Sequence, residues 1–175
     1  MGAAPASTAI AYWRYTLSAH NVIVLTAAPA GRFLEGTLSG VATPGMLMQV
    51  KAGVALDGSG RLTWEKFNGA ADGERTLIAI LREDLMTGRK KTDAYADGDR
   101  IYLYCPIPGD ELQVLVKNET GTAESFQVGD KLIADDGTGL FVPTTGTPES
   151  EPFIVCEEIE AITADTHCHC LFTGY

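Results

Sequence analysis

Apolar and polar positions alternate with a period of two along much of the second half of the chain. Leu112, Val114 and Val116 alternate with neighbours that include Gln113 and Lys117, as in a strand with one buried face. Turn signals recur about every 8–12 residues, which is typical of all-β barrels and sandwiches. The pattern therefore predicts a mainly β protein with few short helices.

Short apolar runs bounded by Gly, Pro, Asn and Asp mark the expected strands. They are Ile10–Leu17, Asn21–Thr26, Met46–Val50, Leu62–Phe67, Thr76–Arg82, Ile101–Cys105, Leu112–Lys117, Leu140–Val142, Phe153–Ile162 and Thr166–Phe172, with a strand–turn–strand corner over Phe126–Leu132. The nearly continuous apolar run of Thr76–Arg82 predicts a strand covered on both faces. Asp84–Lys91 is expected to form a loop or a single helical turn.

Changes in composition divide the chain. Residues 1–9 are small and polar, and 27–31 and 36–45 are rich in Gly, Ala, Ser, Thr and Pro. We therefore interpret residues 1–45 as an extended N-terminal arm and 46–175 as one small β-barrel-like domain. Residues 143–152 are expected to form a long loop.

The charged side chains are unevenly distributed along the chain. The 175 residues carry a net charge of −10, yet residues 1–100 hold 11 basic and 10 acidic side chains. The acidity of the C-terminal part argues against nucleic acid as a partner, because phosphates would be repelled. That part is either a solvated face or a surface that docks on a basic partner.

The N-terminus has neither the basic nor the apolar region of a signal peptide. The longest apolar runs are too short to span a bilayer. We therefore expect synthesis in the cytosol, no membrane partner and four reduced cysteines.

The run His167-Cys168-His169-Cys170 has the residue types that bind zinc. In a strand, however, the two histidines face one way and the two cysteines the other, so one face offers at most two ligands. We expect buried thiols, exposed or interfacial imidazoles, and no bound metal or cofactor. A disulfide in an assembled particle and a zinc site remain open alternatives.

Other motifs indicate turns and surfaces more than catalysis. None of the six serines lies in Gly-x-Ser-x-Gly. Asp97-Gly98-Asp99 and Asp135-Asp136-Gly137 read as turns and lack the ligand pattern of a calcium loop. Glu157, Glu158 and Glu160 are expected on a solvated strand, with Glu158 and Glu160 on one face. No enzyme activity is expected.

Two groups of residues are candidates for contact with a partner protein. Tyr12, Trp13 and Tyr15 on the arm either pack on the protein's own core or anchor it to a partner. Arg89, Lys90 and Lys91 form either a basic surface loop or a docking patch. The full set of interaction candidates is Tyr12, Trp13, Tyr15, Arg32, Phe33, Arg89, Lys90 and Lys91.

Several stretches together resemble capsid decoration (cement) proteins of tailed bacteriophages. They are Thr43–Met48, Leu77–Asp84, Tyr95–Ile101, Pro108–Glu111 and Phe126–Leu132. The likeness covers roughly residues 40–172 and consists of turn and strand patterns. The His/Cys run and the 143–152 loop have no counterpart in it.

The resemblance implies an arm followed by a small barrel-like domain, sometimes called a β-tulip. It implies a homotrimer, or alternatively a homodimer, on the outer surface of the virion, where it would stabilise the head by binding across neighbouring major capsid proteins. The alternatives are a different phage structural protein, such as a tail or head-completion protein, or a small β-barrel metal-binding module. A carbohydrate-binding or carrier module is a further alternative.

Overall fold

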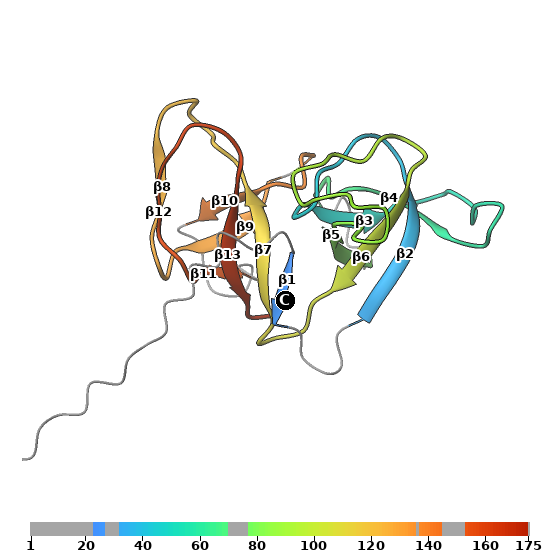
Figure 1. Ribbon diagram of the computed structural model, residues 1–175, viewed down its shortest axis with the longest axis horizontal. Helices are drawn as coiled ribbons and strands as arrows, with labels where there is room; N and C mark the ends of the chain where they lie inside the picture. Colours follow the sequence, from blue (N-terminus) through green and yellow to red (C-terminus); the bar gives the residue numbers. More distant parts are fainter. Residues whose placement is uncertain (1–22, 27–31, 70–76, 136, 145–152, 175) are drawn as a thin grey trace, which may run out of the picture.

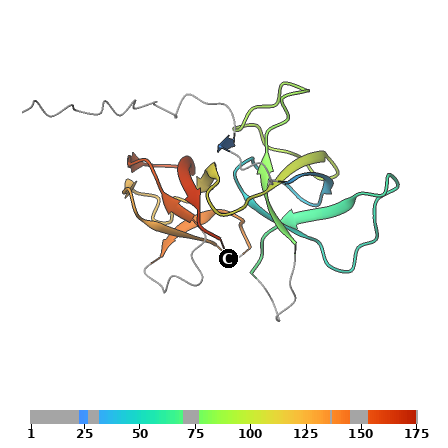
Figure 2. The same ribbon diagram turned by 90° about the horizontal axis from the view of Figure 1, so that it is seen from below.

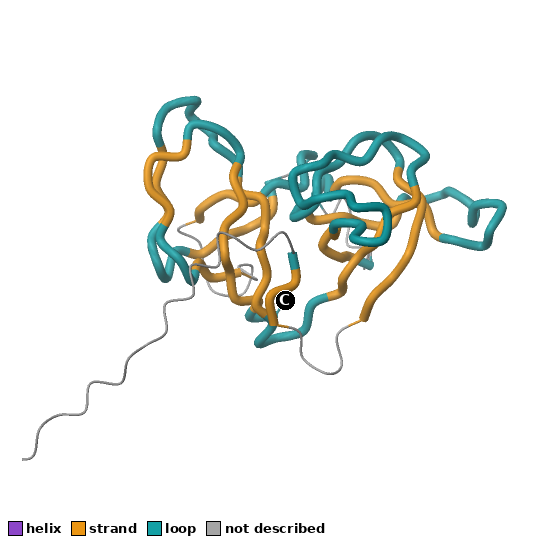
Figure 3. The backbone as a smooth tube through the Cα atoms, viewed as in Figure 1, coloured by secondary structure: helices purple, strands orange, loops and turns teal. Residues whose placement is uncertain are grey.

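The computed structural model describes residues 23–26, 32–69, 77–135, 137–144 and 153–174. This part of the chain is all β and contains no helix (Figure 3), so the mainly β prediction is confirmed while the expected short helices do not occur in it. The strands are β1 (Val24–Thr26), β2 (Arg32–Leu38), β3 (Leu47–Val50), β4 (Leu62–Lys66), β5 (Ile78–Arg82), β6 (Arg100–Cys105), β7 (Glu111–Val116), β8 (Glu124–Phe126), β9 (Lys131–Ala134), β10 (Phe141–Thr144), β11 (Phe153–Val155), β12 (Ile159–Ile162) and β13 (Thr166–Phe172). Consequently, no described helix has the length and hydropathy to cross a membrane.

The first half of the described chain forms a small closed barrel in the order β2-β4-β3-β5-β6. Strands β2 and β4 are parallel and the other neighbours are antiparallel. Apolar side chains fill its interior, because alternate positions of each strand point inward. Trp64, Met48, Leu81 and Leu103 are among the fully buried members of this core.

The structure corrects the predicted extent of the arm. Arg32–Leu38 is a barrel strand that pairs with β6 from Arg32 to Thr37 and with β4 from Gly36 to Leu38. The Gly, Ser and Thr content of residues 36–45 suggested a loop or arm, but β2 closes the barrel and buries Leu38. Residues 1–22 and 27–31 of the predicted arm lie outside the described residues, and Val24–Thr26 between them forms β1.

The second half forms another ring of strands, and residues 46–175 therefore contribute to two rings. The pairings run β7–β10–β9–β11–β13 and return from β13 to β7. Short strand β1 adds to the edge of β7. The aromatic ring of Phe153 packs edge-on against that of Phe141 and at a tilt against that of Phe172 inside this barrel, with centroids 4.9 and 5.1 Å apart.

The two barrels lie side by side (Figures 1 and 2) and share apolar contacts. Leu47, Ile80 and Tyr104 of the first barrel belong to the same buried cluster as the core of the second. Backbone hydrogen bonds cross the joint: the Leu47 N–H donates to the Gly139 carbonyl at 2.7 Å, and the Leu115 N–H to that of Gly45 at 3.0 Å.

Strand β7 lies at this joint and is buried on both faces. The alternation of Leu112, Val114 and Val116 predicted one exposed face. That prediction is wrong because the first barrel covers the other face, where Gln113 and Leu115 lie.

Other observed elements also differ from the predicted ones. The expected strand Phe153–Ile162 is interrupted at residues 156–158, so β11 joins the second ring while β12 pairs with β8 in a separate ribbon (Figure 1). Pro143 and Thr144 of the predicted long loop belong to β10, and residues 145–152 are outside the described part. Asp84–Lys91 is a loop.

Candidate functional site at the joint of the barrels

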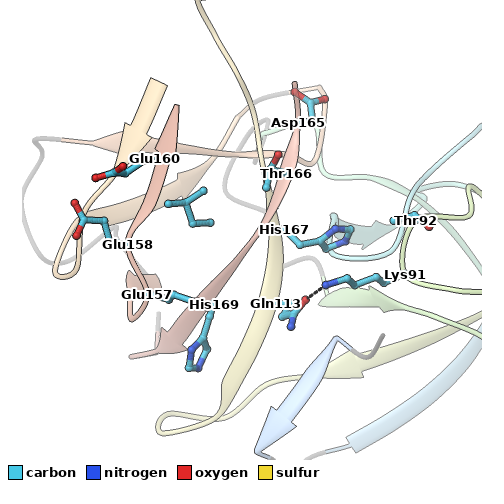
Figure 4. Close-up of a pocket in the computed structure, with 11 residues that line it drawn as sticks. Lys91, Thr92, Gln113, Glu157, Glu158, Glu160, Asp165, Thr166, His167 and His169 are labelled. Carbon is cyan, nitrogen blue, oxygen red and sulfur yellow. Dashed lines mark hydrogen bonds between the residues drawn. The ribbon is translucent and has the colours of Figure 1, made fainter. Parts of the chain in front are cut away.

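A cleft of about 500 Å³ opens where the β5–β6 loop of the first barrel meets β12 and β13 of the second (Figure 4). Its lining combines three carboxylates of one short segment with two imidazoles and one ammonium group. The lining residues are Lys91, Thr92, Gln113, Glu157, Glu158, Ile159, Glu160, Asp165, Thr166, His167 and His169.

The alternation predicted for the His/Cys run is confirmed. In β13, His167 and His169 line the cleft, whereas Cys168 and Cys170 are fully buried in the core of the second barrel. Among the described residues, no group of three or more His, Cys, Asp or Glu side chains has the geometry to hold a metal ion.

His167 belongs to the joint as well as to the cleft. Its Nε2 lies 2.8 Å from the carbonyl oxygen of Pro44, so the neutral ring donates this hydrogen bond. Burial, helped by the charge of nearby Lys91 and opposed by the hydrogen bond to Pro44, lowers the pKa of His167 to about 4. At neutral pH this imidazole is therefore an uncharged group that holds β13 against the first barrel.

Lys91 reaches into the cleft from the β5–β6 loop. Its ammonium group donates to the Oε1 of buried Gln113 (Figure 4). Burial lowers the pKa of Lys91, while the charge of Glu157 opposes that shift. The predicted docking lysine is thus a contact between the two barrels.

The opposite end of the cleft is acidic. Glu158, Glu160 and Asp165 are exposed and Glu157 is half-buried, and Figure 4 shows Glu158 and Glu160 beside β12. Ile159, which lies between Glu158 and Glu160 in the chain, also lines the cleft. Exposed carboxylates attract cations and basic side chains and are not desolvated as a general acid must be.

All four cysteines are free thiols in the structure. Burial raises the pKa values of the Cys105, Cys156 and Cys170 thiols. A protonated thiol is a poor nucleophile and a poor metal ligand.

The carboxylates of the two Asp-Gly turns have hydrogen-bond donors within the protein. Asp97 accepts the Gly40 N–H at 2.7 Å, and Asp135 accepts from the Lys117 ammonium group at 2.8 Å.

The other predicted interaction residues do not gather at the cleft. Arg89 donates to Asp99 at 2.8 Å and lies over the Tyr95 ring, so it stabilises its own loop, while Lys90 is exposed. Arg32 and Phe33 begin β2 and are not among the residues that line the cleft. Tyr12, Trp13 and Tyr15 lie outside the described residues.

Phe33 is 58% exposed, although its ring packs 5.0 Å from that of Tyr104 and lies under the Arg82 guanidinium. The first half of its strand pairs with β6 only, because β4 begins pairing at Gly36. An unpaired strand edge offers backbone donors and acceptors to another chain.

Exposed apolar side chains form a surface feature of which the sequence analysis named only Phe33. Nine large hydrophobic residues are exposed among those described, and only Val128 belongs to the second barrel. The other eight are Phe33, Val41, Val54, Leu56, Leu62, Leu77, Leu85 and Met86. Val54 and Leu56 stand on the β3–β4 loop, which projects from the first barrel (Figure 1). The sequence signal for these two side chains was that they lie outside any alternating pattern of a strand.

No protein-family model matches the sequence, and no curated protein matches it. Among solved structures, the N base of head fiber gp8.5 of bacteriophage phi29 is similar, with 13% sequence identity and a TM-score of 0.48. The similarity covers 82% of this chain and 94% of that chain.

Proposed function

We propose that this chain is a structural protein of a tailed-phage head that decorates the shell by binding across neighbouring major capsid proteins. The observation that carries the proposal is the division of its surface. Eight of the nine exposed large hydrophobic side chains among the described residues lie on the first barrel.

Charge divides in the same way. Residues 32–105 carry ten basic and ten acidic side chains, whereas residues 106–175 carry two basic and thirteen acidic ones. A neutral, apolar surface suits attachment to another protein. A strongly acidic surface suits exposure to solvent, where repulsion keeps particles apart.

In this proposal the first barrel faces the capsid and the second faces outward. The contact would use Phe33, Val54, Leu56, Leu85 and Met86. The two loops that carry four of these residues are braced by backbone N–H groups that donate hydrogen bonds to the loops' own aspartates, Asp57 and Asp84. Braced loops lose little conformational entropy on binding.

Self-association completes the proposal. A homotrimer, or alternatively a homodimer, would place several first barrels against several capsid subunits at once. Each copy would then gain avidity from its neighbours. The role includes no catalytic step, nucleic acid, cofactor or membrane.

The test is co-sedimentation of the purified protein with expanded and unexpanded heads assembled from the cognate major capsid protein. We expect binding to expanded heads in hundreds of copies, and a discrete trimer or dimer by light scattering. The double variant Leu56→Ser/Met86→Ser should lose binding, while Val128→Ser, which removes an exposed apolar side chain from the second barrel, should retain it.

A monomer that ignores both kinds of head would overturn the proposal. Binding in about a dozen copies or fewer would instead identify a head-completion protein. Equal loss of binding in the Val128→Ser control would show that the first barrel is not the attachment surface.

A further inference from the structure

The N-terminal segment enters the described structure at the joint between the barrels. The backbone of Ile23 is held at both ends: its N–H donates to the carboxylate of Glu83 at 3.0 Å, and its carbonyl accepts from the Gln113 N–H at 2.7 Å. Ile23 and Glu83 are both buried. The position of Ile23, to which residues 1–22 are joined, is therefore fixed.

That point borders the cleft. Gln113, whose backbone holds Ile23, extends its side chain to Lys91, and both residues line the cleft. The chain preceding Ile23 therefore joins the described structure at a backbone neighbour of a cleft-lining residue.

The segment and the cleft are complementary in charge. Residues 1–22 contain one charged side chain, Arg14, and no Asp or Glu. The cleft presents the exposed carboxylates of Glu158, Glu160 and Asp165. Arg14 is flanked by Trp13 and Tyr15, and the half-buried apolar side chain of Ile159 lies between the two glutamates.

The N-terminal segment is long enough for Arg14 to reach across the cleft. Ile23 lies nine positions after Arg14, and an extended chain advances about 3.3 Å per position, or roughly 30 Å. That reach crosses a cleft of about 500 Å³ with residues to spare.

We propose that the cleft is the docking site of this chain's own N-terminal segment, with Arg14 against the carboxylates of Glu158 and Glu160 and Trp13 against Ile159. The docking is intramolecular and is a property of the isolated protein. It stands whether or not the protein binds a capsid.

Trp13 provides the readout. The chain has two tryptophans, and Trp64 is fully buried in the first barrel. Acrylamide quenching of the full-length protein therefore reports on Trp13. We expect Trp13 to be protected at low salt and to become accessible as salt is raised.

Glu160→Lys should make Trp13 accessible, with the docked fraction falling about threefold, as expected for one exposed charge pair. Glu119→Lys is the matched control, because it makes the same charge change on an exposed residue of the second barrel outside the cleft. The control should leave Trp13 protected. Unchanged quenching of Trp64 would show that both variants are folded.

Quenching of Trp13 as in a free peptide in the unmodified protein would overturn the proposal. So would equal effects of the two variants. Protection that disappears on dilution would also overturn it, because the occupant would then be the segment of another copy.

Discussion

At the scale of single residues, close approach decides which side chains the first barrel accepts. Gly36 of β2 lies against the Trp64 ring: a Cβ built at Gly36 would lie 2.5 Å from Trp64 Nε1 and 2.9 Å from the Leu62 carbonyl oxygen. Both neighbours are fixed, one by burial and the other by the strand ladder. Glycine is therefore required here for space.

Gly36→Ala should accordingly lower the free energy of unfolding by about 1 to 3 kcal/mol, the usual cost of overpacking a core. Urea denaturation followed by Trp64 fluorescence measures it. Gly58→Ala is the control, because nothing lies within 4 Å of a Cβ at that position. Equal stability of Gly36→Ala and the wild type would show that Trp64 moves aside at no cost.

His167 should make stability depend on pH. Its pKa is about 4 in the folded protein and about 6.5 when unfolded. The unfolded chain therefore binds a proton first as pH falls. The contribution of neutral His167 to the free energy of unfolding is complete above pH 6.5. It is lost between about pH 6.5 and 4, by up to about 1.4 kcal/mol per pH unit.

The measurement is urea denaturation at pH 7 and pH 5. Between them the free energy of unfolding of the wild type should fall by up to about 2 kcal/mol more than that of His167→Gln. The glutamine retains a donor toward the Pro44 carbonyl but does not titrate. The same pH dependence in both proteins would contradict the role given to His167.

At the scale of elements, Asp57 organises the projecting β3–β4 loop. Its carboxylate accepts from the Thr37 hydroxyl at 2.6 Å, from the Ser59 and Arg61 N–H groups, and from the Arg61 guanidinium. These bonds, that from Thr37 foremost, hold the pKa of Asp57 well below its usual range. The loop is thus tied to β2 as well as to its own strands.

Asp57→Ala should increase hydrogen exchange of residues 51–61 at least several-fold and leave exchange of the strands nearly unchanged, because local opening needs no global unfolding. Ser59→Ala should have little effect, since the backbone N–H of residue 59 makes the bond. Exchange mass spectrometry separates the two. Unchanged exchange in Asp57→Ala would mean that side-chain packing alone orders the loop.

At the scale of the whole molecule, the two barrels should unfold together. They share a buried cluster that includes Leu47, Ile80 and Tyr104, and backbone hydrogen bonds join them at Gly45 and Gly139. A shared core makes opening of one barrel costly to the other.

Leu47→Ala should therefore destabilise both barrels by a similar amount, about 2 to 5 kcal/mol. Hydrogen exchange in denaturant would follow β4 and β5 for the first barrel and β9 and β11 for the second. Coincident shifts are expected. A shift confined to the first barrel would show that the barrels are separate folding units.

The sequence predicted the positions of the strands better than it predicted what the protein binds. β3, β5, β6 and β13 fall within one or two residues of their expected positions, because alternation and turn residues act over a few neighbours. Decoration of a capsid stays a prediction, since turn and strand patterns do not specify a partner.

Local pattern alone determined the all-β class and the two faces of β13, because a strand's side chains must alternate. Tertiary structure decided that β2 closes a barrel, that β7 is covered twice and that the 153–162 segment serves two sheets. It also brought Lys91 and Gln113 to the same cleft as His167. These outcomes depend on which distant strands pair, and pairing is set by the summed burial of two shared cores and not by any one segment.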